Sequence, residues 1–271
     1  MQNRCDITVV IPCYNSGATI ERAVKSVVSQ TLIPKEIIIV DDCSSDIGMK
    51  IVLEAIKDSY AHLLDIKIIY AVKNGGSGTA RNLGCNEARC EYIAFLDSDD
   101  VWHPEKLEIQ YTYMKDHMDV YFTCHHMEII RDNDNSFFSK GVYVTEKDII
   151  HINPIIYLFK HYPKGGTSSV VIKKTDLKFE NGKRYSEDYL LWLEYCFNYK
   201  GVLLDVELSA AYKEIYGAGG LSKNLWKLER GEIETYSILK NKGIIELPIY
   251  LSACVFSLIK FLRRWLICLL R

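Results

Sequence analysis

The sequence predicts an α/β protein with a mostly parallel central sheet flanked by helices, and three observations support this prediction. Short apolar runs alternate with stretches of helical period over the first hundred residues, as in sheets whose parallel strands are joined by helices. Each apolar run ends in polar or turn-forming residues. After about residue 102 the alternation changes, which indicates a second half of different construction.

The elements follow from these runs in chain order. Strands are predicted over 6–12, 36–42, 65–72 and 91–97. An amphipathic helix is predicted between the first two strands, from the repeated apolar residues Ile20, Ala23, Val24, Val27 and Val28. Further elements are expected at 51–56 (helix), 78–89 (helix), 103–117 (helix) and 119–130 (strand). We expect one domain over 1–217, with halves 1–102 and 103–217, and a helical C-terminal region over 218–271.

Charge and cysteine content narrow the class of protein. The formal net charge of -2 argues against nucleic acid as a partner, because phosphate backbones are usually bound by a basic excess. The nine cysteines are scattered, form no C-x2-C pairs and follow no secretory leader, which favours a reducing compartment. We therefore expect a cytoplasmic protein and assign the cysteines no function.

The strand ends carry the polar sequences "CYNSG", "DDCSSD", "NGGSG" and "DSDD". Because ligands of open α/β sheets bind outside the carboxyl ends of the strands, we expect these ends to form one site. In the last of them, Asp97, Asp99 and Asp100 crowd negative charge into a small space, which Mg²⁺ or Mn²⁺ together with substrate phosphate oxygens would relieve. A solvated acidic turn that begins the next helix is the alternative.

Five ordered stretches carry a resemblance to a known family: "TVVIPCYN" (8–15), "SVVSQT" (26–31), "EIIIVDDCSSD" (36–46), "NGGSGTARNLG" (74–84) and "YIAFLDSDDVW" (92–102). Together they resemble the family 2 glycosyltransferases, which have the GT-A fold, a nucleotide-sugar-binding α/β domain. Many bacterial relatives build surface polysaccharides such as O-antigen. Farther on, "SEDYLLW" (186–192) looks like the E-D motif of that family. The resemblance is good to about residue 217 and poor beyond it.

The resemblance implies donor-binding roles at the strand ends. The turn from Pro12 to Asn15 would hold the nucleotide with Tyr14 against the base, and Asp42 would accept a hydrogen bond from the uracil N–H. Arg81 would meet the diphosphate or sugar hydroxyls. The residues alone leave open a rim tyrosine, an aspartate that caps the next helix, and an arginine on a solvated helix face.

The resemblance also implies a metal site and a base. Asp99 would bind the cation, Mn²⁺ or Mg²⁺, and Asp97 would contact the ribose or donor sugar and share in the metal site, while Asp100 would support them or begin the next helix. Asp188 would take the proton of the acceptor hydroxyl, with Glu187 as a support or acceptor contact. Two acids that merely favour a helix N-terminus are the alternative. The stretch "KGGTSSVV" (164–171) would form a loop on the acceptor side or a flexible loop before a strand.

The C-terminal stretch from 247 to 271 is apolar apart from Lys260, Arg263, Arg264 and Arg271. On a helix these cations share one face, so we expect an amphipathic helix on the membrane surface with its cations toward lipid head groups. Three charges within the run argue against a transmembrane helix. Packing on the core of the protein or on a second subunit is the alternative.

These expectations combine into one predicted function. The chain would be an inverting, metal-dependent glycosyltransferase that moves a hexose, glucose or galactose, from a UDP-sugar to a polyprenyl-diphosphate-linked sugar at the cytoplasmic face of the inner membrane. Two alternatives stay open: a nucleotidyltransferase that makes a sugar nucleotide, and a non-catalytic module that binds nucleotide sugars at the membrane.

Overall fold

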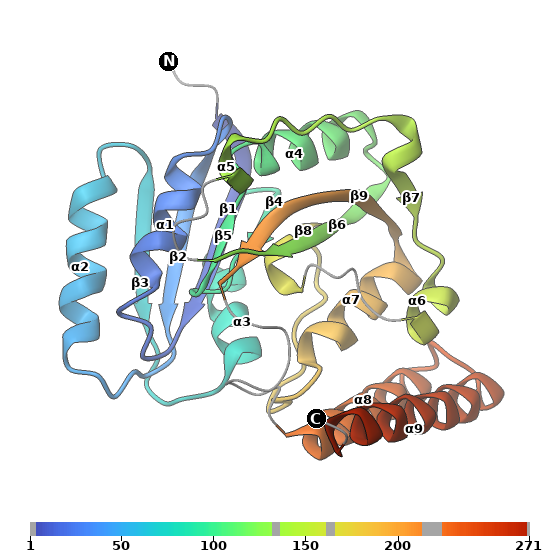
Figure 1. Ribbon diagram of the computed structural model, residues 1–271. Helices are drawn as coiled ribbons and strands as arrows, with labels where there is room; N and C mark the ends of the chain where they lie inside the picture. The colour runs from blue at the N-terminus through green and yellow to red at the C-terminus, as the bar shows by residue number, and fades with distance from the viewer. Residues whose placement is uncertain (1–3, 132–135, 161–165, 213–223, 270–271) are drawn as a thin grey trace.

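The computed structural model describes residues 4–131, 136–160, 166–212 and 224–269, and places one twisted sheet between two layers of helices (Figure 1). The strands are β1 (Arg4–Cys13), β2 (Ile33–Asp41), β3 (Asp65–Tyr70), β4 (Tyr92–Phe95), β5 (Asp100–Trp102), β6 (Val120–Ile129), β7 (Ile149–His151), β8 (Val171–Lys173) and β9 (Lys200–Ala211). The helices are α1 (Ile20–Val28), α2 (Gly48–Tyr60), α3 (Ser77–Glu87), α4 (Lys106–Asp116), α5 (Ser136–Ser139), α6 (Pro154–Lys160), α7 (Glu187–Asn198), α8 (Leu225–Asn241) and α9 (Leu247–Leu269), with 3-10 turns η1 (Glu146–Asp148) and η2 (Thr167–Ser169).

The sheet has the strand order β3-β2-β1-β4-β8-β6-β9-β5, and β7 pairs with another part of β9. The first four strands are parallel throughout, so their carboxyl ends lie at one edge. Strand β8 then runs antiparallel to both β4 and β6, while β6 and β9 are parallel to each other. The sheet therefore has a parallel half that can hold a ligand at its edge and a mixed half that follows it.

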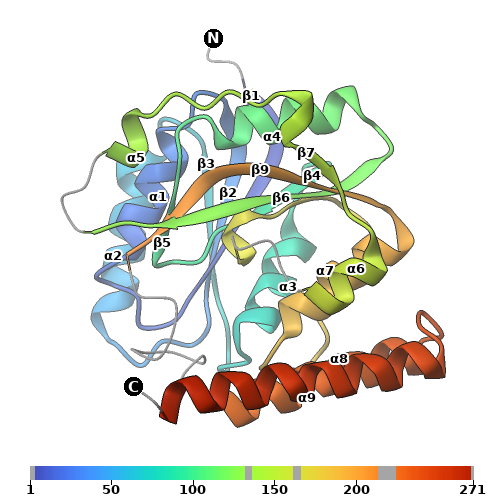
Figure 2. The same ribbon diagram turned by 45° about the vertical axis from the view of Figure 1, so that its right-hand side comes forward.

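Two apolar clusters fill the spaces between sheet and helices. Alternate residues of the central strands enter opposite clusters, as Val9 and Val10 of β1 do, because successive side chains of a strand point to opposite faces. Helices α1, α2 and α4 cover one face, and α3, α6, α7 and the α8–α9 pair contribute to the other cluster. Figures 1 and 2 show these two layers from two directions.

The elements predicted from the apolar runs are confirmed, with end points that differ by a few residues. Of the two roles left open for Asp100, the start of a helix is excluded, because the chain forms the short strand β5 there and α4 starts only at Lys106. Strand β5 exists because β9 lies beside it, pairing Trp102 with Ser209 more than a hundred residues later. The domain boundary expected near 217 lies outside the described residues.

The C-terminal region forms two long helices, α8 and α9, packed along each other beneath the α7 side of the sheet (Figure 2). Two of the cations expected to face lipid instead face α8: Lys260 pairs with Glu232 (2.9 Å) and Arg264 with Glu229 (3.1 Å). Buried carboxylates on α8 attract them inward, since an unpaired buried charge is costly. Arg271 lies outside the described residues. Within the described part of the chain, no helix combines the length and apolar character needed to cross a bilayer.

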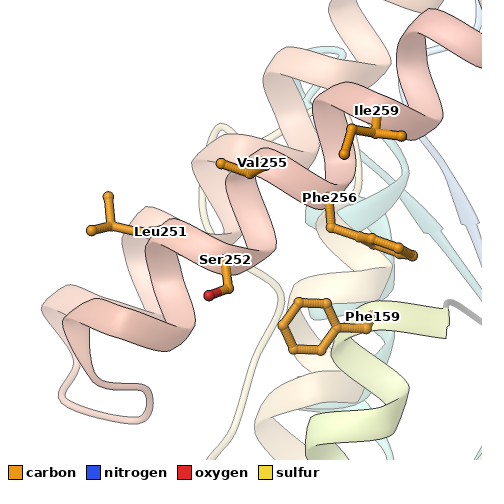
Figure 3. A pocket seen from close by; sticks show the side chains of 6 residues that line it. All are labelled: Phe159, Leu251, Ser252, Val255, Phe256 and Ile259. Atoms are coloured by element: carbon orange, nitrogen blue, oxygen red, sulfur yellow. The ribbon is translucent and has the colours of Figure 1, made fainter.

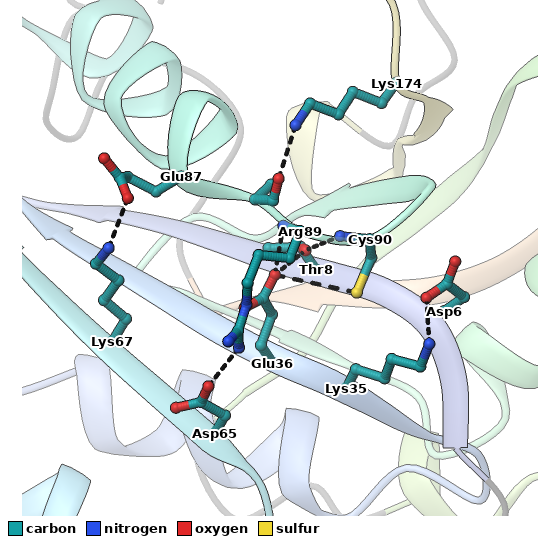
Figure 4. Close-up of polar contacts among 11 residues, drawn as sticks. Asp6, Thr8, Lys35, Glu36, Asp65, Lys67, Glu87, Arg89, Cys90 and Lys174 are labelled. Atoms are coloured by element: carbon teal, nitrogen blue, oxygen red, sulfur yellow. Dashed lines mark hydrogen bonds and ion pairs between the residues drawn. The ribbon is translucent and has the colours of Figure 1, made fainter.

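A second group of charged residues lies at the amino ends of the parallel strands, away from the strand-end site (Figure 4). The buried Glu36 carboxylate accepts hydrogen bonds from Thr8 Oγ1 (2.6 Å) and from the Arg89 backbone N–H and Nε (2.7 Å each). Arg89 also pairs with Asp65 on β3. These contacts join β1, β2, β3 and the start of β4. We therefore assign this group of charged residues a structural role.

Candidate active site

The loops after β1 and β2 are tied together at the carboxyl edge of the sheet by Asn15. The side-chain oxygen of Asn15 accepts hydrogen bonds from the Ser45 and Asp46 backbone N–H groups (3.0 and 3.1 Å). The backbone N–H of Asn15 donates to Ser44 Oγ (2.9 Å). Asn15 adopts a positive φ of 50°, a conformation that asparagine tolerates better than most residues. The side chain predicted to hold the nucleotide therefore also shapes the loop around it.

The other residues of this turn differ in exposure. Pro12 is buried inside β1, where it pairs with Val40, so the turn begins later than expected. Tyr14 follows the end of the strand with 49% of its surface exposed. An exposed ring at a strand end is free to stack on a base, whereas Pro12 can offer a ligand little beyond its backbone.

Asp42 organises the glycine loop before α3. Its two carboxylate oxygens accept hydrogen bonds from the backbone N–H groups of Gly75 (2.8 Å) and Gly76 (2.7 Å), and its backbone carbonyl accepts from Asn74 Nδ2 (3.0 Å). Gly76 needs to be glycine because its φ is +86°. The Asp42 side chain does not cap the helix after β2, which is the alternative role left open for it. Its buried carboxylate holds a loop 33 residues away.

Arg81 is a buried link between the two acidic motifs rather than a residue on a solvated helix face. Its guanidinium pairs with Asp97 Oδ1 (2.7 Å) and Glu187 Oε1 (3.2 Å) and lies over the Phe179 ring, 5.4 Å from its centre. Burial alone would lower the pKa of the guanidinium, but the carboxylates of Asp97 and Glu187 outweigh burial and raise it. A charged Arg81 therefore fixes the Asp97 carboxylate against the E-D motif.

The turn between β4 and β5 carries the three aspartates at two depths. Asp97 and Asp99 are half-buried, and Asp100 is buried beneath them, where Ser168 Oγ donates to its Oδ2 (2.6 Å). Burial and the nearby charge of Asp97 raise the pKa of Asp100 to about 7. Asp100 thus supports the turn from below, which leaves Asp97 and Asp99 as the candidate metal ligands.

The E-D motif divides its two acids in a similar way. Glu187 is buried and accepts hydrogen bonds from Ser77 Oγ (2.6 Å) and Arg81, and burial followed by the charge of Asp188 raises its pKa. Asp188 is half-buried and accepts from Thr167 Oγ1 (3.1 Å) and from the Tyr189 N–H (2.8 Å). Glu187 is therefore the buried acid of the motif, held by Ser77 and Arg81, and Asp188 is the more accessible one.

Close packing against Glu187 explains why residue 78, in the stretch "NGGSGTARNLG" (74–84), is a glycine. A Cβ on Gly78 would lie 2.9 Å from the Cγ of Glu187, so any side chain there would push α3 away from α7. The residue before Glu187, Ser186, has a positive φ of 55°. Strained backbone of this kind is held in place by its surroundings, here by Thr235 Oγ1, which donates to the Ser186 carbonyl (3.4 Å).

Several site residues are not identified by the sequence alone. Ser98 Oγ donates to Ser16 Oγ (2.8 Å) and ties the aspartate turn to the loop after β1. Arg22 of α1 donates to the Asp99 carbonyl (3.4 Å) and stacks on Tyr212, 3.5 Å from the ring centre. No local pattern marks these residues, because their partners are distant in the chain.

The carboxylate oxygens at this edge of the sheet are suitable ligands for a hard cation, but they are few. Among the described residues, no group of three or more His, Cys, Asp or Glu side chains is arranged to hold a metal ion. The carboxylates of Asp97 and Asp99 are oxygen donors of the kind that Mg²⁺ and Mn²⁺ accept, and the Asp97 side chain keeps 34% of its surface exposed. A cation here would need further oxygens, from water or from a bound ligand, to complete its shell.

Comparison with protein families matches residues 8–177 to the glycosyl transferase family 2 model. An Escherichia coli relative, the UDP-Glc:α-D-GlcNAc-diphosphoundecaprenol β-1,3-glucosyltransferase WfaP, is 32% identical over 88% of this chain and 87% of its own length. The chain spans about three fifths of the length of some other curated relatives that it matches, 58% and 62% of two of them.

Solved structures give the fold. S. aureus TarS in complex with UDP-GlcNAc aligns with a TM-score of 0.65 at 22% identity, over 86% of this chain and 66% of that one. The Pyrobaculum calidifontis mannosyltransferase PcManGT, in complex with GDP-Man and Mn²⁺, aligns with a TM-score of 0.64 at 14% identity, over 93% and 70%. The chain therefore has the GT-A fold predicted for it.

Proposed function

The chain belongs to glycosyltransferase family 2, and on that premise we propose that it transfers a hexose, glucose or galactose, from a UDP-sugar to a hydroxyl of a sugar carried on a polyprenyl diphosphate. The observation that carries the proposal is that Arg81 and η2 join the half-buried Asp97 to the E-D motif, where Asp188 is also half-buried. The name of WfaP supports the choice of donor and acceptor. Bacterial surface polysaccharide is the expected product.

The proposed reaction is a single displacement with inversion at the anomeric carbon. Asp188 takes the proton of the acceptor hydroxyl while that oxygen bonds to the anomeric carbon, and the bond from this carbon to the diphosphate breaks. The electron pair leaves with UDP, so no covalent enzyme intermediate forms. Tyr14 and Asn15 would bind the nucleotide. Asp42 holds the glycine loop with one hydrogen bond to each carboxylate oxygen, and the second lone pair of either oxygen would accept the uracil N–H.

Asp99 and Asp97 would hold Mn²⁺ or Mg²⁺. A cation bound there would neutralise charge that develops on the departing diphosphate. The exposure of the Asp97 carboxylate supports this assignment, as does the Mn²⁺ found together with GDP-Man in the PcManGT complex. Arg81 holds one oxygen of Asp97, which orients the carboxylate toward the edge of the sheet.

Helix α9 would hold the enzyme on the membrane surface, with its apolar face rather than its cations toward the lipid. Leu251, Val255, Ile259 and Leu262 are each more than half exposed, and a shallow hollow of about 500 Å³ lies between this row and Phe159 of α6 (Figure 3). Arg263 of α9 is exposed and would favour anionic lipid, whereas Lys260 and Arg264 are paired with acids on α8.

The test of transfer is a radiolabel assay with purified full-length protein. UDP-glucose and UDP-galactose are each supplied with a synthetic GlcNAc-diphospho-lipid, with Mn²⁺ or with EDTA. We expect lipid-bound label only with the cation, and its loss in Asp99→Asn and Asp188→Asn but not in the exposed control Asp58→Asn. Nucleotide binding without transfer from any donor would favour a non-catalytic module. Product from UTP and a sugar phosphate would favour nucleotidyl transfer.

The membrane assignment has its own test, co-sedimentation with vesicles that contain phosphatidylglycerol. Ile259→Glu should weaken binding severalfold, because it places a charge in the apolar row of α9. The matched control is Ile47→Glu, at a residue that is 92% exposed between β2 and α2. Equal binding of the two variants would contradict a role for α9.

A further inference from the structure

A short 3-10 turn, η2, lies between the two acidic groups of the site. Its residues Thr167 and Ser168 are 4% and 0% exposed, although their side chains are polar. They follow Gly166, whose φ of +56° turns the chain into the site. Buried hydroxyls need partners, and the partners of these two residues are the acidic groups themselves.

Ser168 is bonded to the aspartate turn at three points. Its Oγ donates to Asp100 Oδ2 (2.6 Å) and accepts from the Asp97 N–H (3.0 Å), and its carbonyl accepts from Trp102 Nε1 (2.7 Å). The position of η2 is therefore fixed relative to the residues that would hold the metal and the donor.

Thr167, the adjacent residue, is bonded to the base. Its Oγ1 donates to Asp188 Oδ2 (3.1 Å), while Asp188 Oδ1 accepts from the Tyr189 N–H (2.8 Å). One donor comes from the helix that carries Asp188 and the other from η2, so together they fix the plane of the carboxylate. A β-branched threonine has few rotamers, which makes it a stiff donor.

We infer that Thr167 is a positioning residue that holds the carboxylate of Asp188 in register with the Asp97–Asp99 turn through its bonded neighbour Ser168. The inference rests on the proposed function, in which Asp188 is the base. In a single displacement the base and the leaving diphosphate lie on opposite sides of one carbon, so the distance between their holders affects the rate. Thr167 does not touch the reacting atoms and acts through Asp188.

The experiment compares Thr167→Val, which keeps the shape and removes the hydroxyl, with Thr167→Ser, which keeps the hydroxyl. We expect Thr167→Val to lower kcat by about tenfold to a hundredfold, the range for a displaced catalytic group, with the KM for the UDP-sugar unchanged. Thr167→Ser should recover kcat to within about twofold of the wild type, because its hydroxyl can make the same bond. The matched control is Thr175→Val, which removes a hydroxyl bonded to Tyr195 (2.9 Å) away from the acids.

The outcomes separate this inference from the proposed function. Asp188→Asn is assayed beside the threonine variants, with UDP-glucose and UDP-galactose and the synthetic lipid acceptor. Full activity of Asp188→Asn, or a wild type inactive with both donors, would overturn the proposed function and the inference with it. An inactive Asp188→Asn beside a fully active Thr167→Val would overturn the inference alone. An equal loss in Thr167→Ser and Thr167→Val would assign Thr167 to packing. Thr167→Ala replaces Thr167→Val if thermal unfolding shows that the latter does not fold.

Discussion

Replacing Arg81 by Met should destabilise the protein strongly, because it leaves a buried carboxylate without its cation. The side chains of Arg81 and Glu187 are 4% and 8% exposed, so water cannot replace the lost partner of Glu187. Breaking a buried ion pair by removing one member costs about 3–5 kcal/mol. The other partner, Asp97, is 34% exposed and adds less, about 1 kcal/mol or below. Methionine keeps most of the apolar stem of arginine, so the lost stability reports the contribution of the guanidinium group.

The size of the effect is testable by a double-mutant cycle with Glu187→Gln. In that background the buried charge is absent, so Arg81→Met should cost only about 1 kcal/mol, and the coupling between the two sites should be about 2–4 kcal/mol. Urea unfolding followed by circular dichroism gives both values. A loss of about 3 kcal/mol also corresponds to a fall in Tm of roughly 6 °C or more.

Arg4→Met is the control for Arg81→Met. Arg4→Met removes an exposed guanidinium that donates to the Leu63 carbonyl (2.8 Å), and it should change stability by about 0.5 kcal/mol or less. If Arg81→Met costs less than about 1 kcal/mol, or costs the same in both backgrounds, the idea that Arg81 neutralises a buried Glu187 is wrong.

Three further substitutions test the packing and charge of the core by urea unfolding. Lys106→Met should stabilise the protein at pH 7 by about 1 kcal/mol or more, because the amine is buried and burial lowers its pKa well below the usual range. The wild type should gain stability as the pH rises toward the pKa that the amine has in the unfolded chain. The advantage of methionine should therefore be smaller at pH 9 than at pH 7. Gly84→Ala should cost about 1–3 kcal/mol, because its Cβ would lie 2.5 Å from Val10 Cγ1, and a neutral result would mean that α3 can move off β1. Arg89→Ala should lower stability, but less than the loss of a fully buried pair because Arg89 is 65% exposed, and it should leave transfer activity intact; lost activity would contradict the structural role given to Glu36.

The parallel half of the fold could be predicted because its information is local. The runs that become β1 and β2 are continuous and apolar, as strands buried on both faces are, and each ends in residues that favour turns. The motifs at those ends then fall at one edge of the sheet for geometrical reasons. Strand β5 could not be predicted because its three residues are held in the extended form by pairing with β9.

The partners of the site residues could not be predicted, because they depend on contacts between distant parts of the chain. Arg81 has no local feature that separates a solvated helix face from a buried link, and its partner Glu187 lies 106 residues later. The hydroxyl of Ser168 meets Asp100 across 68 residues. Lys260 and Arg264, predicted to face lipid, face α8 for the same reason, since the acids that draw them inward are on that helix.

The electrostatics of the site link the proposed metal to the proposed donor. The β4–β5 turn, the first residue of β5 and the E-D motif together carry five acidic side chains, Asp97, Asp99, Asp100, Glu187 and Asp188. The guanidinium of Arg81 already serves two of them and cannot also neutralise an incoming diphosphate. In the proposed function UDP would therefore bind poorly without a cation, and the cation would bind poorly to Asp97 and Asp99 without phosphate oxygens. Each ligand should raise the affinity of the other by the same factor, because coupling between two binding sites is reciprocal. In the proposed function, the crowded acids at the end of β4 are therefore half of a site that the cation and the diphosphate complete.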